Sequence, residues 1–280
     1  MNTFKQSGKH LELVEWQEQN PKIVAGFTTR EGGNSSEPFY SMNMGFHVDD
    51  NPEIVRKNRK KFAELIGFPI ENWVSSKQVH GAKVVKVSMN TCGHGSLDFE
   101  TAIPDSDALY TSDEDILLTS LYADCVPLYF YEPNEQLVGL AHAGWKGTVA
   151  KIGPEMVKIW VEKENVDVKT IQVAIGPSIG ECCYEVDDRV INEVKAALNG
   201  TDDCQIYKKN DNGKFQLNLK KLNESLLMHA GVLQENIIIS EQCTSCENDI
   251  FFSHRKDKGK TGRMMSYIGM KGDLSGFGNR

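Results

Sequence analysis

Residues 116–147 read ILLTSLYADCVPLYFYEPNEQLVGLAHAGWKG and decide the fold. This stretch holds three apolar runs, and each has the length and composition of a buried β-strand. The same pattern recurs on both sides of it. Strands are therefore expected at residues 22–29, 73–79, 116–122, 126–131, 137–142, 171–175 and 236–240.

Helical patterns lie between several of these strands. The clearest begins at Asn51, a capping residue followed by a proline in the first turn, and ends near Gly67. A second follows residues 147–148, and its apolar stripe consists of Val149, Ile152, Met156 and Ile159. Two more helices are expected at residues 187–198 and 219–230, and surface loops at 92–104 and 201–213. The alternation predicts a mixed α/β fold, with residues 1–280 forming a single domain.

The composition is that of an ordinary globular protein. With 280 residues, 40% of them hydrophobic, the chain can bury a full core. Its 31 Lys and Arg residues against 39 Asp and Glu give a net charge of -8, which argues against nonspecific binding to nucleic acid or membranes. The N-terminus has no apolar segment of the signal-peptide type, and Asp124 interrupts the longest apolar run. Seven cysteines, an odd and sparse number, fit a reducing compartment, so we expect a cytoplasmic protein.

Several short motifs resemble known binding sites but lack the other residues that those sites require. The segment KGKTG at residues 258–262 resembles the end of a phosphate-binding loop, but His254 stands where that loop requires glycine. Cys243 and Cys246 have the spacing of half a zinc ribbon, but no second C-x-x-C pair exists. The adjacent Cys182 and Cys183 are expected to pack as small apolar residues.

Two histidines and one cysteine stand out at the ends of the apolar runs. They are His80 in KQVHG, Cys125 in ADC and His142 in AHAGWKG. Two imidazoles and one thiolate suit zinc, and three protein ligands leave the fourth position open, as in catalytic sites. The ligands are too widely spaced for a compact zinc finger, so only the fold could unite them. The alternative is that all three are buried core residues without a metal.

Five segments, in this order, resemble the laccase-domain family, whose members are also called polyphenol oxidases or peptidoglycan editing factors: KQVHG, SLYADCVPLYFY, GLAHAGWKGT, IGPSIGECCYEV and FFSHRKDKGKTGR. The motif-bearing part covers about residues 22–270. The resemblance implies a single-domain α-β-β-α layered sandwich with mixed sheets. It also implies a zinc ion on the residues that match the family's ligands, His80, Cys125 and His142.

Within that family the chain looks like the bacterial members that act on purine nucleosides. The resemblance implies phosphorolysis of adenosine, inosine and related nucleosides, such as guanosine and methylthioadenosine, to a free base and ribose 1-phosphate. Deamination of adenosine is implied as a further activity. Copper-dependent oxidation of phenols is also described for the family, but seven scattered histidines lack the clusters of a multicopper site. We therefore expect purine nucleosides and inorganic phosphate as partners, zinc rather than copper, and a monomer or homodimer.

Phosphorolysis requires cationic groups that hold phosphate in a fixed geometry, and arginine suits this best. Asn58 and Arg59 lie among the apolar positions of the first predicted helix, and the pair matches the family. We therefore predict that Arg59 is a catalytic residue that contacts phosphate, although its head could instead reach solvent while its stem packs. Arg30 and Arg263 are further candidates for phosphate or ribose contacts, whereas Arg255 is expected to be a solvated charge.

Three polar residues complete the predicted site. Asp124 adjoins Cys125, and its carboxylate could orient a histidine ligand, exchange protons with substrate or only accept backbone hydrogen bonds. We predict a catalytic role for it. Asn43 and Gln78 are expected, by analogy with the family, to line the substrate site.

Two other functions remain open. Cys125 could be a nucleophile with His142 as its base, in a hydrolase that edits peptidoglycan precursors. Alternatively, His47 or His254 could supply a fourth ligand, which would close the metal site and make it structural.

Overall fold

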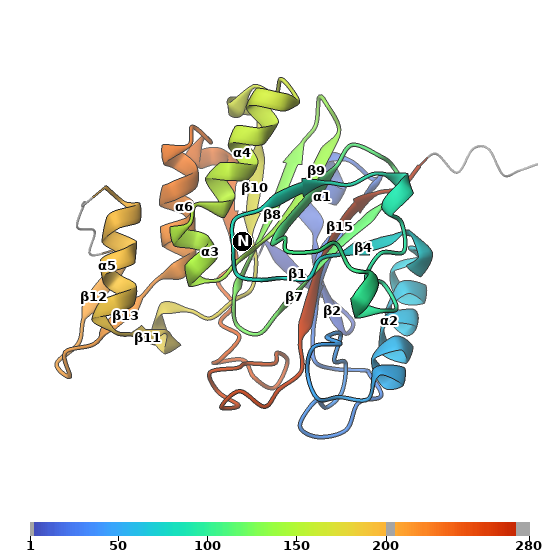
Figure 1. Ribbon diagram of the computed structural model, residues 1–280, viewed down its shortest axis with the longest axis horizontal. Helices are drawn as coiled ribbons and strands as arrows, with labels where there is room; N and C mark the ends of the chain where they lie inside the picture. The colour runs from blue at the N-terminus through green and yellow to red at the C-terminus, as the bar shows by residue number, and fades with distance from the viewer. Residues whose placement is uncertain (1–2, 200–204, 273–280) are drawn as a thin grey trace, which may run out of the picture.

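Two large sheets form the centre of the computed structural model, which describes residues 3–199 and 205–272 (Figure 1). The first sheet consists, in spatial order, of β1 (Phe4–Ser7), β2 (His10–Leu13), β3 (Ile23–Thr28), β15 (Met264–Met270), β7 (Leu117–Tyr122) and β4 (Trp73–Ser75). Only β4 pairs in parallel, with β7, and the other neighbours are antiparallel. This is a mixed sheet, as the family resemblance implies.

The second large sheet carries the quoted stretch at its centre. In spatial order it consists of β14 (Ile237–Ile239), β10 (Gln172–Ile175), β8 (Val126–Glu132), β9 (Leu137–Ala143), β6 (Ala108–Thr111) and β5 (Val84–Lys86). Its two edge pairs are parallel and its inner pairs antiparallel. A small antiparallel sheet consists of β11 (Glu185–Val186), β13 (Phe215–Leu217) and β12 (Tyr207–Lys209).

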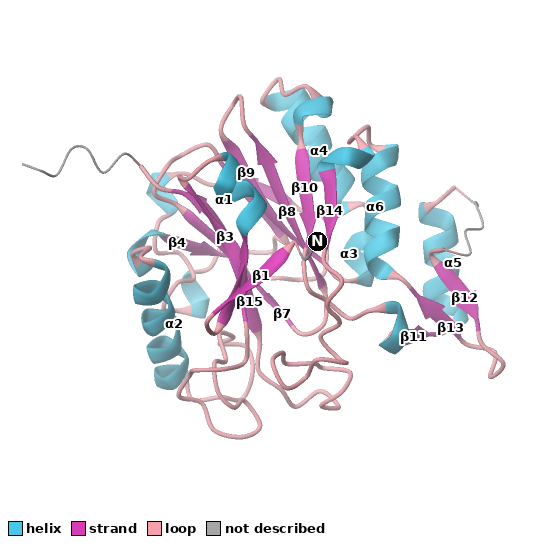
Figure 2. Ribbon diagram, turned by 180° about the vertical axis from the view of Figure 1, so that it is seen from behind, coloured by secondary structure: helices cyan, strands magenta, loops and turns pink. Residues whose placement is uncertain are grey.

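Helices lie outside the two large sheets. The described α-helices are α1 (Val14–Gln19), α2 (Pro52–Ile66), α3 (Trp145–Val149), α4 (Ile152–Lys163), α5 (Asp188–Ala197) and α6 (Leu219–His229). α2 lies on one side of the molecule and α3, α4 and α6 on the other, with the sheets between them (Figures 1 and 2). None of these helices has both the length and the apolar composition that crossing a lipid bilayer requires.

Three clusters of buried apolar side chains fill the spaces between the layers. One cluster, with Phe62 and Tyr267, packs α2 against the first sheet. A second lies between the two sheets and includes Phe27 and Tyr129. The third, with Trp160, packs α4 and α6 against the second sheet. The layers therefore follow the order α-β-β-α, which confirms the predicted fold class.

The boundaries of α2 confirm the capping argument made from the sequence. The Asn51 side chain accepts a hydrogen bond from the Glu53 amide, and a proline occupies the first turn. Gly67 ends the helix in the left-handed conformation, at φ 59°. The buried face of the helix carries Arg59, as the periodicity predicts.

Other predicted elements differ from the structure. The strand expected at residues 73–79 ends at Ser75. Ser76 forms only an isolated bridge with Ile103, and His80 has the left-handed φ of 60°. The helix expected after residue 148 is divided into α3 and α4 at Lys151, whose φ is 63°. Strand β15 was not predicted, since Ser266 and Gly269 interrupt its apolar run and no polar alternation marks it. Of the loop expected at 201–213, residues 201–204 lie outside the described residues and 207–209 form β12.

Candidate functional site

The side chains of His80, Cys125 and His142 come together at one end of the two sheets. One ligand atom from each lies within 4.8 Å of the other two. The two imidazole rings meet edge to face, with their centroids 4.8 Å apart. His80 follows β4, Cys125 lies between β7 and β8, and His142 is near the end of β9. Two imidazoles and a thiolate at this separation are the donor set that zinc takes in catalytic sites.

The buried carboxylate of Asp107 positions both histidines. Its Oδ1 accepts hydrogen bonds from Nδ1 of His142, at 2.8 Å, and from the amide of His80, at 2.9 Å. Its Oδ2 accepts from the amides of Val79, at 3.1 Å, and Gly81, at 2.8 Å. Because a carboxylate only accepts, Nδ1 of His142 carries the proton and Nε2 is left to bind a metal ion. The three amides also account for the left-handed conformation of His80.

The charges of these groups favour a thiolate at Cys125. Burial alone would raise the pKa of the Cys125 thiol, but His142 and His80 lower it to about 6. Burial alone would lower the pKa of His142, but Cys125 and Asp107 raise it to about 9. Burial works against the ionised form of Asp107 too, yet the hydrogen bonds from His142 and the amides hold its pKa below the usual range. The thiolate is the form that binds metal ions and attacks electrophiles.

Gly144 allows the candidate ligands to approach one another. A Cβ at this position would lie 2.9 Å from Sγ of Cys125 and 3.1 Å from Cδ2 of His80. Both distances are shorter than ordinary van der Waals contacts. The glycine in the segment AHAGWKG is therefore required by the packing of the site.

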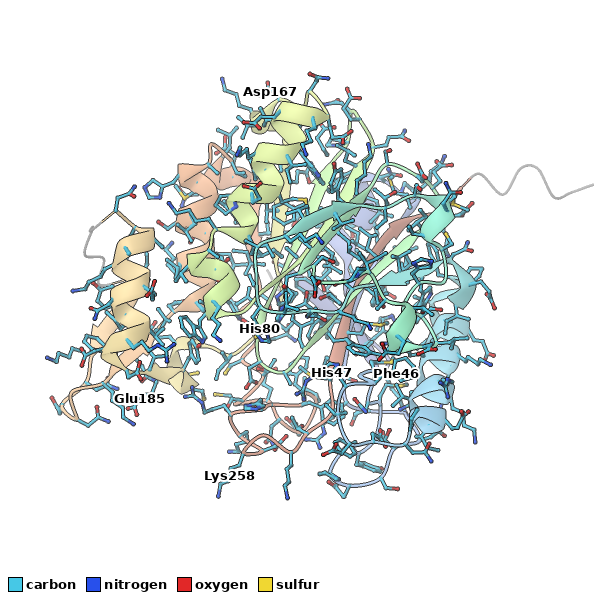
Figure 3. The ribbon with its side chains drawn as sticks, viewed as in Figure 1. Phe46, His47, His80, Asp167, Glu185 and Lys258 are labelled. Carbon is cyan, nitrogen blue, oxygen red and sulfur yellow. The ribbon has the colours of Figure 1, made fainter. Side chains whose placement is uncertain are left out.

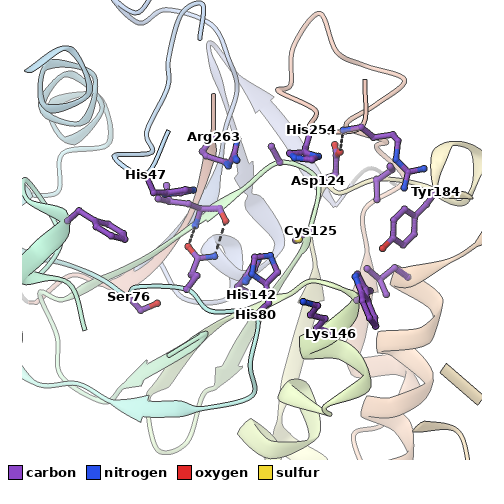
Figure 4. A pocket seen from close by; sticks show the side chains of 18 residues that line it. His47, Ser76, His80, Asp124, Cys125, His142, Lys146, Tyr184, His254 and Arg263 are labelled. Carbon is purple, nitrogen blue, oxygen red and sulfur yellow. Dashed lines mark hydrogen bonds between the residues drawn. The ribbon is translucent and has the colours of Figure 1, made fainter. Parts of the chain in front are cut away.

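The candidate ligands face a pocket of about 560 Å³ (Figure 4). Sites for small molecules typically measure about 300–1000 Å³. The pocket is lined by His47, Ser76, Gln78, His80, Phe99, Leu121, Ala123, Asp124, Cys125, His142, Trp145, Lys146, Ile179, Tyr184, Leu219, His254, Arg255 and Arg263. His47 and His80 also appear in Figure 3, between the sheets and the lower loops.

Cationic and aromatic side chains share this pocket. Lys146, Arg255 and Arg263 line it, and these side chains can bind an anion. Desolvation, followed by the charges of Arg263 and Arg59, lowers the pKa of His47 to about 4, so His47 is neutral at pH 7. The aromatic lining residues are Phe99, Trp145 and Tyr184. The pocket can therefore accept a ligand with both an anionic group and a flat ring.

Besides the three candidate ligands, three further residues predicted from the sequence line the pocket. Gln78 exchanges two hydrogen bonds with the backbone of Leu121, at 3.0 and 2.9 Å. Asp124 accepts from the hydroxyl of Thr244, at 2.7 Å, and from the amide of Arg255, at 2.9 Å. The carboxylate that orients His142 is thus Asp107 and not Asp124. Arg263 donates to the carbonyls of residues 261 and 262 and is fixed in the pocket wall.

Three other predicted residues lie outside the pocket lining. Arg59 is 1% exposed, and its guanidinium donates to the carbonyls of Met44, Gly95 and Ser96 at 2.7–2.9 Å. Asn43 is fully buried and bonds to Asp50 and to the backbone of residues 45 and 263. Arg30 donates to the carbonyls of residues 40 and 248. These bonds hold loops together, and substrate contacts by these three side chains stay a prediction.

Asp107 and Lys146 were not predicted from the sequence. Asp107 precedes β6, a strand of four residues that no pattern indicated. Lys146 lies within the segment AHAGWKG together with the candidate ligand His142, so the sequence alone places it near the site. His47 and His254 line the pocket, but neither belongs to the described ligand group with atoms within 4.8 Å. Neither histidine therefore supplies a fourth ligand to that group on its pocket side.

Sequence and structure comparisons agree with one another. A family model described as "Multi-copper polyphenol oxidoreductase laccase" matches residues 24–271. The chain is 48% identical over 248 residues to "Purine nucleoside phosphorylase YlmD" of Geobacillus stearothermophilus, covering 89% of this chain and 90% of the relative. It is 45% identical over 264 residues to the Bacillus subtilis protein of the same name, covering 93% and 94%. The crystal structure of YlmD from Geobacillus stearothermophilus superposes with a TM-score of 0.93 at 44% identity, covering 97% of this chain and 100% of that chain.

Proposed function

The chain belongs to the multi-copper polyphenol oxidoreductase laccase family, and from this premise we propose that it is a zinc-dependent purine nucleoside phosphorylase. The observation that carries the proposal is the position of His80, Cys125 and His142 in the wall of a pocket with cationic and aromatic lining. The names of the relatives in Geobacillus and Bacillus support the same substrate class. Adenosine deamination is proposed as a side activity of the same pocket.

Zinc fits the donor set better than copper. Among the described residues, groups that could hold a metal ion are this His2Cys set and a set of four cysteines, and neither is a histidine-rich cluster. A multicopper oxidase site would require several such clusters. A zinc ion bound here would polarise a substrate atom during phosphorolysis, and for the deamination of adenosine it would lower the pKa of the water that replaces the amino group of the purine.

The chain's own residues would bind and orient the two substrates. Lys146, Arg255 and Arg263 would hold phosphate with an oxygen directed at C1′ of the ribose. The aromatic side chains would stack on the purine. The bond between C1′ and N9 then breaks, a phosphate oxygen bonds to C1′, and the departing purine takes up the proton that the hydrogen phosphate gives up. Asp124, which lines the pocket, is the proposed group for that proton exchange.

Incubation with inosine, with and without phosphate, tests this proposal. The wild type is expected to release hypoxanthine and ribose 1-phosphate only when phosphate is present. In His80→Ala, kcat/KM should fall about 100-fold or more, because one ligand and its positioning are lost. His229→Ala, an exposed histidine on α6 outside the pocket, is the matched control and should retain full activity. Base release without phosphate, or full activity in His80→Ala, would refute the proposal.

A cysteine hydrolase is a second candidate, and one observation favours it. Asp107 bonds to His142, whose ring lies beside the Cys125 thiol. Cys125 could thus be the nucleophile, His142 its base and Asp107 the acid that orients the base. The lowered pKa of Cys125, about 6, suits a nucleophile as well as a ligand.

Chelation separates the two candidates. A zinc enzyme should lose activity when the ion is removed and regain it when zinc is restored. Its Cys125 should react with iodoacetamide only after chelation, since a bound ion shields the thiolate. A hydrolase would keep its activity with chelator present, and Cys125 would be alkylated at the same rate with or without it.

A further inference from the structure

A second group of potential metal ligands lies outside the pocket lining. The Sγ atoms of Cys182, Cys183, Cys243 and Cys246 all lie within 4.8 Å of one another. Sγ of Cys182 is 3.6 Å from that of Cys243 and 3.4 Å from that of Cys246, and Sγ of Cys183 is 3.4 Å from that of Cys246. A disulfide would need about 2.05 Å. Zinc in a tetrahedron of thiolates at about 2.3 Å would place the sulfurs about 3.8 Å apart.

We propose that Cys182, Cys183, Cys243 and Cys246 bind a structural zinc ion as thiolates, independently of the ion in the pocket. A closed set of four sulfurs leaves no position for water, so this site supports the fold and carries no chemistry. Binding would release to solvent the protons of those thiols that are still protonated.

The geometry corrects two interpretations made from the sequence. Cys182 was expected to pack as a small apolar residue, but Cys182 and Cys246 are both exposed. The Cys243-x-x-Cys246 pair was set aside because it has no second C-x-x-C partner. Its partner is instead the adjacent pair Cys182-Cys183, which lies 60–64 residues earlier in the chain.

The backbone around the cysteines is arranged to bring them together. Ser178, after β10, and Cys243, after β14, form an isolated parallel bridge. The amide of Gly180 donates to Sγ of Cys243 at 3.2 Å, a contact that stabilises a thiolate. A Cβ at Gly180 would lie only 3.2 Å from Sγ of Cys182, so glycine permits the close approach. A backbone bridge and four sulfur atoms thus hold together two segments that are far apart in the sequence.

Two cations lie beside this group. Lys220 is only 7% exposed, and its Nζ donates to the carbonyls of Ser240 and Gln242, both at 2.7 Å. Arg255 donates from Nη1 to the carbonyls of Cys183 and Glu185, both at 3.1 Å. Four thiolates around a dication leave excess negative charge, and buried or fixed cations nearby would offset it.

The proposed ion would also stabilise one wall of the pocket. Ile179 and Tyr184 flank the first cysteine pair, and both line the pocket. Thr244, next to Cys243, donates to Asp124, another lining residue. Loss of the ion would release both segments from each other and thereby loosen this wall.

Zinc content of the full-length protein tests the proposal. After reduction, zinc loading and gel filtration, the wild type should retain two ions per chain by mass spectrometry. Cys92→Ser, which removes a cysteine outside both ligand groups, should also retain two. His80→Ala should retain one, and the double variant Cys182→Ser/Cys246→Ser should lose the other. Cobalt bound to His80→Ala should show the charge-transfer absorption of a tetrahedral thiolate complex, and chelation should lower its thermal midpoint.

His80→Ala decides the outcome even if the double variant does not fold, because only the four-cysteine site is intact in it. One ion per chain, with all four cysteines protected from alkylation until it is removed, supports the proposal. No bound ion, with these cysteines alkylated at once or found as disulfides, overturns it. Phosphorolysis by the wild type is measured separately, so failure of the proposed function would not alter this count.

Discussion

Asparagine in place of Asp107 is expected to weaken metal binding about 10- to 100-fold and to lower kcat/KM by a similar factor. The carboxylate accepts from Nδ1 of His142 and from three amides in the His80 loop. An asparagine side chain has one acceptor oxygen, and its NH2 group would point at N–H donors from which it cannot accept a hydrogen bond. The free energy of unfolding should fall by about 1.5–3 kcal/mol, the usual worth of a hydrogen bond to a charged group.

Competition with a chromophoric chelator measures the metal affinity of Asp107→Asn, and urea unfolding measures its stability. Asp49→Asn makes the same change at an exposed position and should alter neither. A variant with wild-type metal affinity and kcat/KM would show that His142 and the His80 loop do not depend on this carboxylate.

Replacement of Arg59 by methionine is expected to destabilise the fold by about 3 kcal/mol or more, with little change in the KM for phosphate. The guanidinium donates to three loop carbonyls and lies over the ring of Phe46, with 4.5 Å between Cζ and the ring centroid. Methionine fills similar space but leaves the carbonyls without their charged donor. Since Arg59 does not line the pocket, the folded fraction should bind phosphate normally.

Urea unfolding and phosphate-dependent kinetics separate the two roles considered for Arg59. Lys60→Met, at an exposed position of α2, serves as the control and should change stability little. Normal stability in Arg59→Met together with a large increase in the KM for phosphate would instead establish the phosphate contact that the sequence predicts.

The strongly patterned elements could be predicted from the sequence. β7, β8 and β9 are long apolar runs, and α2 has a capping residue, a proline and a terminal glycine. Elements without such signals were missed. β15 reads MMSYIGM, and Ser266 and Gly269 interrupt its apolar run, so it shows neither a long apolar run nor an alternation. β6 is too short to form a pattern by itself.

The residues of the candidate site likewise divide into those that the sequence marks and those that it does not. His80, Cys125 and His142 are rare side chains at the ends of apolar runs, so the sequence marks them. Asp107 resembles any other aspartate in the sequence, and its contacts depend on the parallel pairing of β5 and β6 beside it. The four-cysteine group was missed because its two halves are joined by a long-range bridge between Ser178 and Cys243.

Anomalous diffraction at the zinc absorption edge, from crystals of the zinc-loaded protein, tests the account most directly. We predict an anomalous peak that marks a zinc ion about 2.0–2.3 Å from a ring nitrogen of His80, Sγ of Cys125 and Nε2 of His142. Its fourth position should face the pocket and hold water or substrate. No peak at this position, or a peak whose fourth ligand is a protein side chain such as His47 or His254, would contradict the account.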